Sequence, residues 1–274
     1  MQDRVRNVRT MRLAAMLLAA VIGAGCASAS EKPGAGASEQ PGPGAGPALV
    51  LVTGATGGTG REVVGQALAA GYAVRALVRD EARARELFGD RVSYVALDVR
   101  DSAAIPAAVA GVDYVISTLG SSSRSDPTNT PELIDYGAVK ALAESAQAAG
   151  VKQFVLLSSM GVTDPDHMLN KILNNVLLWK KRGEDALRAT GMPYTIVRPG
   201  GLRDGEKGGS GGLTVLQGDP QQLGQVTRGD VAAILVQALG NDAALFRTFE
   251  VIGDPNGSPP DWNTFFDGLE RDGR

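Results

Sequence analysis

The feature that most constrains the fold of this chain is a glycine-rich loop between an apolar segment and a helical one. Residues 48–53 form a continuous apolar stretch, which is typical of a buried parallel strand. Gly54, Gly57 and Gly60 follow at intervals of three, and residues 61–70 place apolar side chains at helical spacing. Glycine permits a tight turn and a close approach to phosphate, and a helix N-terminus offers free N–H groups to a pyrophosphate. The pattern predicts a strand–turn–helix unit that binds a dinucleotide.

The whole loop is expected to contact that cofactor. The residues concerned are Gly54, Thr56, Gly57, Gly58, Thr59 and Gly60. The alternative is a glycine-rich turn that serves only the packing of the helix on the strand. The context favours binding, because the loop follows the first strand of an alternating pattern.

Strand and helix patterns alternate along the rest of the chain. Strands are expected over residues 72–78, 92–97, 113–118, 151–158, 194–197, 213–217, 225–227 and 248–252. Helices are expected over residues 80–88, 102–110, 131–149, 169–190 and 230–239, with a mobile loop over 200–212 and a closing helix over 262–266. This alternation predicts an α/β fold, a single Rossmann-like domain with a doubly wound parallel sheet and helices on both faces.

The end of the second strand bears on the choice of dinucleotide. An acidic residue there would bind the ribose 2′-hydroxyl of NAD, whereas this chain has Arg79 followed by Asp80. A guanidinium suits a 2′-phosphate, so we expect NADP, with NAD as the alternative. Asp98, after the third strand, is expected either to accept a hydrogen bond from the adenine amino group or to cap a helix. Leu119 and Gly120, after the fourth strand, are expected to run past the cofactor.

The N-terminal segment has the pattern of an export signal. Residues 1–12 hold four arginines and one acid, and residues 13–22 form an apolar run that is too short to span a bilayer. Small residues follow up to Cys26. The pattern predicts a signal peptide of lipoprotein type over residues 1–25, with lipid attached to Cys26. The alternative is a buried apolar cysteine in an N-terminal helix.

The composition then changes abruptly. More than half of residues 31–47 are Gly or Pro, so residues 26–47 are expected to form a flexible, lipid-anchored linker. The Rossmann-like domain is expected over residues 48–255 and a C-terminal tail over 256–274. We expect an exported protein held at a membrane on its periplasmic side. The alternative is a cytoplasmic location, because dinucleotides are cytosolic.

Composition excludes several other classes of function. The formal net charge is −3, so no basic field attracts nucleic acid. The chain has one Cys and one His, which argues against a disulfide framework and against a metal site built from these residues. The partner that remains is a small-molecule substrate.

Several motifs together resemble the atypical short-chain dehydrogenases/reductases, in their NmrA-like, NAD(P)-binding branch. They are TGATGGTG at the glycine loop, VRALVRD, FVLLSSMGV, LLWKKRGEDALRATGMPYTIVRPGGL over residues 178–202 and VTRGDVAAILVQAL over residues 226–239. The resemblance covers about residues 48–255. It implies a Rossmann-like domain that binds NADP(H), and a monomer is favoured because members of this branch are often monomeric.

The resemblance also identifies candidate catalytic residues. Active members use a Tyr phenol as general acid, a Lys four residues later that holds the nicotinamide ribose, and a Ser that orients the carbonyl. Lys180 and Ser158 match the Lys and the Ser, but Val176 stands where the Tyr is expected. The sequence Tyr136 to Lys140 has the right spacing but precedes the serine strand, so we interpret it as coincidental. The resemblance places Pro199 beside the nicotinamide.

Two functions remain open. The first is an NADP(H)-dependent oxidoreductase that reduces a flavin-, quinone- or carbonyl-like acceptor without a Tyr general acid. The second is a non-catalytic dinucleotide-binding redox sensor or assembly factor anchored at a membrane. A sugar-nucleotide epimerase is disfavoured by Val176, and the single imidazole, His167, is expected to be a solvated loop residue.

Overall fold

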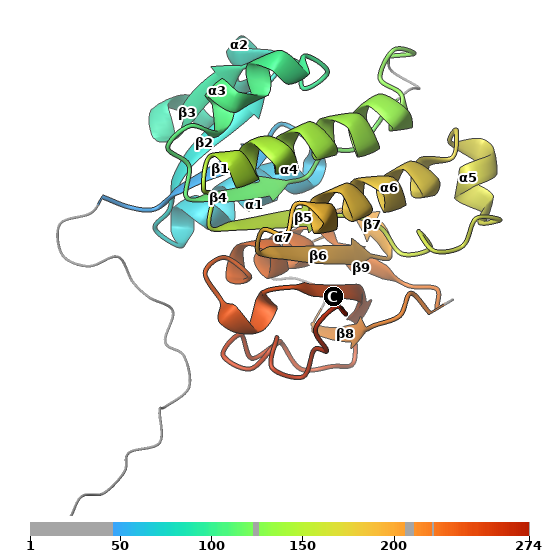
Figure 1. Ribbon diagram of the computed structural model, residues 1–274. Coiled ribbons are helices and arrows are strands. Elements are labelled where there is room, and N and C mark those ends of the chain that lie inside the picture. Colours follow the sequence, from blue (N-terminus) through green and yellow to red (C-terminus); the bar gives the residue numbers. More distant parts are fainter. Residues whose placement is uncertain (1–45, 123–125, 206–210, 221, 274) are drawn as a thin grey trace, which may run out of the picture. The chain divides into compact units, whose positions relative to one another are not determined.

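Strands and helices alternate from Leu49 onward, as the apolar spacing predicts (Figure 1). The computed structural model describes residues 46–122, 126–205, 211–220 and 222–273. Cys26, the predicted signal segment and residues 26–45 of the predicted linker lie outside the described residues. The strands are β1 (Leu49–Thr53), β2 (Ala73–Val78), β3 (Ser93–Ala96), β4 (Tyr114–Ser117), β5 (Gln153–Leu157), β6 (Tyr194–Pro199), β7 (Gly201–Arg203), β8 (Gly212–Leu216), β9 (Gln225–Thr227) and β10 (Arg247–Asp254).

The helices follow the predicted order. They are α1 (Gly58–Ala69), α2 (Glu81–Phe88), α3 (Ile105–Val109), α4 (Val139–Ala148), α5 (Met168–Ile172), α6 (Val176–Ala189) and α7 (Arg228–Gln237). A π-helical segment, η3 (Glu132–Ala138), leads directly into α4. Short 3₁₀ turns lie at η1 (Gly89–Arg91), η2 (Ser102–Ala104) and η4 (Asp242–Ala244).

The main sheet has eight strands in the order β3-β2-β1-β4-β5-β6-β10-β8. Every neighbouring pair is parallel except β10 and β8, which run antiparallel. The chain leaves β1 toward β2 and β3 and then returns to the other side of β1 with β4. This order confirms the predicted doubly wound, Rossmann-like fold.

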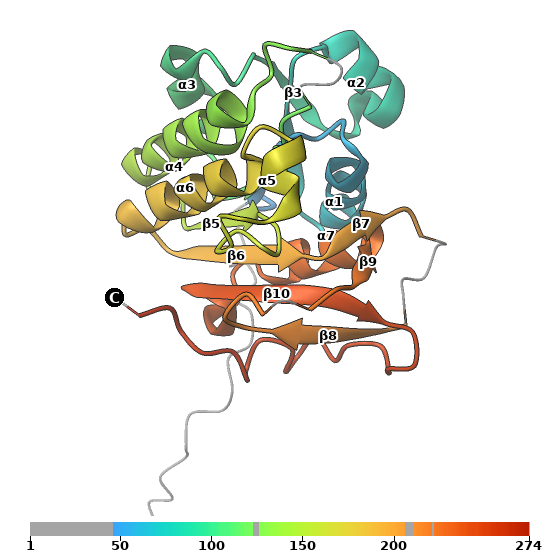
Figure 2. The same cartoon turned by 90° about the vertical axis from the view of Figure 1, so that its right-hand side faces the viewer.

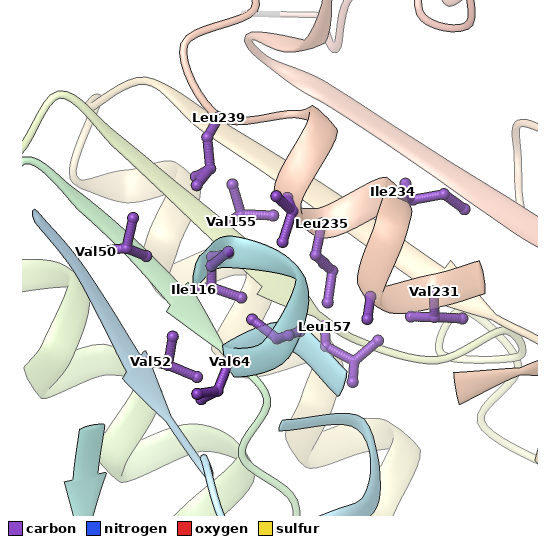
Figure 3. Packing of buried hydrophobic residues seen from close by; sticks show 14 of the residues in the cluster. Val50, Val52, Val64, Ile116, Val155, Leu157, Val231, Ile234, Leu235 and Leu239 are labelled. Atoms are coloured by element: carbon purple, nitrogen blue, oxygen red, sulfur yellow. The ribbon is translucent and has the colours of Figure 1, made fainter. Parts of the chain in front are cut away.

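Helices cover both faces of the sheet (Figures 1 and 2). Successive side chains of a strand point to opposite faces, so Val50 and Val52 pack with α1 and α7, whereas Leu51 packs with α3, α4 and α6. Figure 3 shows the first of these cores, where Val64 of α1 and Leu235 of α7 lie with the valines of β1. The continuous apolar run of β1 is therefore buried on both sides, as expected for a central parallel strand.

The helix predicted over residues 169–190 is instead two helices, α5 and α6. Asn174 and Asn175 both adopt left-handed backbone conformations, with φ of 51° and 58°, and they end the first helix. Asn170 then fixes the break, because its buried Oδ1 accepts the N–H of Leu177 at 2.9 Å in the first turn of α6. The apolar spacing continues across the break, which is why the sequence suggested one helix.

Two further expectations are corrected in the C-terminal third. The described part of the predicted loop over residues 200–212 contains β7, which pairs in parallel with β9, and residues 206–210 of this loop lie outside the described residues. The predicted closing helix over residues 262–266 is a series of turns. The aromatic rings of this tail pack on β10, with the ring centroids of Phe266 and Phe249 6.1 Å apart, so burial fixes the tail without a helix.

Within the described ranges, none of the helices combines the length and the apolar run that crossing a bilayer requires. Nor do three or more His, Cys, Asp or Glu side chains gather as a metal site among those residues.

Candidate functional site

The site lies where the strand order reverses, between β1 and β4. Loops at the carboxyl ends of these two strands meet, and ligands of doubly wound sheets bind in such a crevice. Gly54 has φ +73°, and a Cβ there would lie 2.8 Å from the carbonyl oxygen of Thr118. The first glycine is therefore required both by its backbone conformation and by the close approach of the loop after β4.

The glycine loop leaves the N-terminus of α1 open. A Cβ on Gly60 would lie 2.1 Å from the carbonyl oxygen of Gly54, so only glycine fits there. Gly57 is the N-cap, no side chain caps the helix, and no acid stands in its first turn. The N–H groups of this turn and the positive end of the helix dipole thus face the crevice without a side-chain partner. This arrangement fits the pyrophosphate of a dinucleotide.

A small pocket of about 200 Å³ lies on the β2 side of the crevice. Arg79 and Asp98 both line it, as do Leu119 and Gly120. Asp98 is paired within the pocket, since the Nε of Arg100 donates to its Oδ1 at 2.9 Å. These hydrogen bonds from Arg100 lower the pKa of Asp98 below its usual value.

Arg100 is a residue that the sequence analysis missed. One terminal nitrogen of Arg79 lies 3.6 Å from Oδ2 of Asp126, and one of Arg100 lies 3.7 Å from the same oxygen. The two guanidinium groups therefore share one carboxylate at the rim of the small pocket. The only sequence signal for Arg100 is its position two residues after Asp98.

A large cleft of about 1580 Å³ continues from the glycine loop across the ends of β4, β5 and β6. It brings together most of the predicted residues, namely Gly57, Gly58, Thr59 and Gly60 with Leu119, Gly120, Ser158, Lys180 and Pro199. Thr56 lies in the small pocket instead. The predicted cofactor and reaction residues thus line two adjoining hollows on one edge of the sheet.

Lys180 is fixed at the wall of the large cleft. Its Nζ lies 2.8 Å from Oδ1 of Asp135, a buried residue whose Oδ2 accepts the N–H of Ser121 at 3.2 Å. A Cβ on Gly183 would lie 2.2 Å from the carbonyl oxygen of Asp135, so this glycine lets α6 approach η3. The close helix contact sets the position of the ammonium group.

No phenol stands four residues before Lys180, at the position where the resemblance implies a tyrosine. Val176 occupies it and is buried against Val162 and Leu177. The ring of Tyr136 stacks on Trp179 with centroids 5.9 Å apart, and Lys140 pairs with Glu144 at 3.0 Å. The contacts of Tyr136 and Lys140 are thus explained by packing and by an exposed ion pair.

A buried network of charges lies directly beneath Ser158. The Oγ of Ser158 donates to Oε1 of Glu184 at 2.6 Å, and the Nε of Arg198 donates to the same oxygen at 2.9 Å. Arg198 also donates to Oε2 of Glu184 at 2.6 Å and to Glu250 at 2.9 Å. Burial opposes the charge of Arg198, but the two carboxylates raise its pKa above the ordinary value.

This network was not predicted from the sequence either. The only sequence signal is a charged residue whose immediate neighbours in the strand are apolar, namely Arg198 in β6 and Glu250 in β10. Such a charge needs a buried partner, but the pattern does not say which one.

Asp219 fixes the loop after β5 at the far edge of the large cleft. Its carboxylate accepts the N–H groups of Gly161 at 2.6 Å and Thr163 at 2.8 Å. Burial acts to raise the pKa of Asp219, but these hydrogen bonds lower it on balance. His167 lines the same cleft, and its Nδ1 accepts the N–H of Leu169 at 3.1 Å, so it acts as a cap for α5.

Arg228, at the start of α7, is a further residue that was not predicted. Its Nε would lie 2.6 Å from a Cβ on Gly58, and its side chain lines the large cleft. A terminal nitrogen of Arg228 contacts the exposed Asp204 at 3.0 Å. Gly58 is the third glycine of the loop. Because it has no side chain, the guanidinium of Arg228 can lie across the loop at this position.

Comparisons with known proteins agree with this geometry. A family model described as NAD(P)H-binding matches residues 54–242. An uncharacterised chloroplastic protein of Arabidopsis thaliana is 35% identical over 77% of this chain and 71% of its own length. Sanguinarine reductase of Eschscholzia californica is 32% identical over 76% of this chain and 90% of its own length. The solved structure of an anaerobillin reductase from Escherichia coli O157:H7 superposes with a TM-score of 0.63 at 27% identity, covering 77% of this chain and all of that one.

Proposed function

This chain belongs to the NAD(P)H-binding family of atypical short-chain dehydrogenases/reductases, and we propose that it is an NADP(H)-dependent reductase. Its acceptor is flavin-, quinone- or carbonyl-like, and the enzyme works without a tyrosine as general acid. The observation that carries the proposal is the large cleft beside the glycine loop. Lys180 and Ser158 line this cleft, and the site has no phenol at Val176. Two of the similar proteins are named as reductases, which supports the same class of reaction.

Each group of the site has a distinct part in this proposal. When bound, reduced NADP supplies a hydride. The amides at the start of α1 hold its pyrophosphate, and Arg79 and Arg100 bind the 2′-phosphate in place of their shared contact with Asp126. Lys180, held by Asp135, donates to the hydroxyls of the nicotinamide ribose.

Among the three acceptor classes, the lack of a tyrosine acid favours a flavin or a quinone over a simple carbonyl compound. A ketone reduced by hydride becomes a strongly basic alkoxide and needs a proton at once. A quinone or flavin becomes a delocalised anion that takes its proton from water. The large cleft is roomy enough for such a ring system beside the dinucleotide, since ligand pockets for drug-sized molecules span about 300–1,000 Å³.

The test is a titration of the full chain with NADPH and NADH, followed by NADPH oxidation with menadione and with FMN. We expect tight NADPH binding, weaker NADH binding and turnover with at least one acceptor. Tight binding without turnover across quinones, flavins and carbonyl compounds would replace the proposal with the non-catalytic alternative, a redox sensor or assembly factor. Absence of binding to either nucleotide would overturn both.

We also propose that a lipid on Cys26 holds the protein at a membrane, with residues 26–47 as the tether. This proposal rests on the basic start, the short apolar run and the small residues before Cys26. Cell fractionation of wild type and Cys26→Ala tests it. We expect the wild type in the membrane fraction and the variant in the soluble fraction, and a variant that stays with membranes would contradict it.

A further inference from the structure

The hydroxyl hydrogen of Ser158 is used in a hydrogen bond within the protein. Ser158 lies at the carboxyl end of β5 and lines the large cleft, yet only 6% of the residue is exposed. Its Oγ donates to Oε1 of Glu184 at 2.6 Å. A serine has one hydroxyl hydrogen and two acceptor lone pairs, so this bond leaves only acceptor capacity toward the cleft.

The direction of this bond is fixed by the surroundings of Glu184. Glu184 is fully buried, and its two oxygens accept two hydrogen bonds from Arg198 and one from Arg188 at 3.2 Å. A carboxylate between two guanidinium groups has no proton to donate. Ser158 must therefore be the donor in its hydrogen bond with Glu184. If its hydrogen pointed elsewhere, lone pairs of the Ser158 Oγ and of the Glu184 Oε1 would face each other.

We infer that Ser158 accepts a hydrogen bond from its ligand, so that the ligand group it meets is an N–H donor of the dinucleotide or of the acceptor and not a carbonyl oxygen. Glu184 is the positioning residue that imposes this polarity. The inference rests on the proposed reductase function, because it names the chemistry of the molecule that enters the large cleft. It reverses the role expected for Ser158 from the family resemblance, in which the hydroxyl orients a carbonyl.

Lys180 gives the wall of the large cleft a hydrogen-bond donor, in contrast to the acceptor at Ser158. Its ammonium group only donates, and it lies on α6, the helix that also carries Glu184. The walls thus offer a donor at Lys180 and an acceptor at Ser158. A carbonyl oxygen placed against Ser158 would meet lone pairs without a hydrogen between them, which is unfavourable for a buried polar group.

Two ligand groups have this chemistry, the carboxamide NH₂ of the nicotinamide and an N–H of the acceptor. The first arm of the test compares NADPH with its 3-acetylpyridine analogue, in which a methyl group replaces the NH₂. If Ser158 accepts from the carboxamide, the wild type should bind NADPH about fivefold to tenfold more tightly, as for one neutral hydrogen bond. Ser158→Ala should bind the two dinucleotides equally.

The second arm compares kcat/KM for a flavin with a free N3–H and for its N3-methyl derivative. If Ser158 accepts from the acceptor, the wild type should prefer the free N3–H by about fivefold to tenfold, and Ser158→Ala should lose the preference. A steric effect of the methyl group alone would appear equally in both proteins.

Two variants serve as controls in both arms. Ser158→Thr keeps the hydroxyl and should keep the preference, which separates polarity from loss of stability. Ser159→Ala removes the neighbouring hydroxyl, whose hydrogen goes to the carbonyl oxygen of Met160 at 3.0 Å, and should leave the preference unchanged.

The inference is overturned if Ser158→Ala changes neither preference. That result is separate from the proposed function, which wild-type turnover of NADPH would still support. If the wild type binds NADPH but turns nothing over, the reductase proposal fails and the first arm alone decides the inference.

Discussion

The small pocket and the large cleft use charged side chains in opposite ways. At the small pocket, the side chain of Arg79 is 55% exposed and its one carboxylate contact is long, at 3.6 Å. Beneath the large cleft, Arg198 is 6% exposed and bonds to Glu184 at 2.6 Å. The first guanidinium is available to a ligand, whereas the second is already fully paired. Removal of charge from the small pocket should therefore weaken ligand binding, and removal of charge below the large cleft should lower the stability of the fold.

The largest effect is expected from Glu184→Gln. This change leaves Arg198 and Arg188 facing a neutral amide, and breaking a buried pair costs about 3–5 kcal/mol of unfolding free energy. Urea denaturation measures it. Lys140→Ala, which breaks the exposed pair with Glu144, is the matched control and should leave the urea midpoint unchanged. Equal midpoints for the two variants would abolish the distinction.

Arg79→Ala should show the opposite pattern. A hydrogen bond to a charged group contributes about 1.5–3 kcal/mol, so NADPH affinity should fall about tenfold to a hundredfold. NADH lacks the 2′-phosphate and should bind as before, and the urea midpoint should stay constant because Arg79 is exposed. Calorimetric titration with both nucleotides checks this, and an equal loss for NADH would contradict the 2′-phosphate contact.

Gly60→Ala tests the loop that joins the two regions. Its Cβ would lie 2.1 Å from the carbonyl oxygen of Gly54, and forced overpacking costs about 1–3 kcal/mol of stability. NADPH affinity should fall as well, because the turn must shift. Gly65→Ala on the same helix meets nothing within 4 Å and should stabilise the protein by about 0.5–1 kcal/mol.

The smallest effect is a pH dependence at the edge of the large cleft. The native pKa of Asp219 lies below the unfolded value of about 3.9, so the carboxylate stabilises the fold above that pH. This contribution is lost as pH falls through the native pKa. Asp219→Asn should therefore be less stable than wild type near pH 7, and the gap should close in acid. Urea midpoints of both proteins, measured from pH 7 down into the acid range, test this difference in stability. The exposed Asp267→Asn is the control.

The sequence predicted the glycine loop better than the charge network beneath Ser158, and the reason is distance along the chain. Gly54, Gly57 and Gly60 act within one turn, so their spacing alone specifies the geometry. Glu184 and Glu250 reach Arg198 from separate elements, and their pairing depends on β10 entering the sheet beside β6. Periodicity indicates that such charges are buried but not which partner satisfies them.

The missed helix break has a different physical basis. Asn174 and Asn175 are neither Gly nor Pro, and the break that they form is held by local hydrogen bonds from Asn175 and Leu177 to Asn170. The spacing of the aromatic residues in the tail fits a helix. The rings of Phe265 and Phe266 instead pack on Phe249 from a series of turns.

The place of β10 in the sheet has a consequence for biosynthesis. This strand follows β1 to β9 in the chain, yet it lies inside the sheet between β6 and β8. The strands β1 to β4, with the glycine loop and the small pocket, leave the ribosome well before Glu250 exists. Until then β6 is an open edge, and Arg198 lacks one of its two acidic partners. The nucleotide-binding half can thus assemble during translation, while the half that would carry the chemistry must wait until β10 has been made.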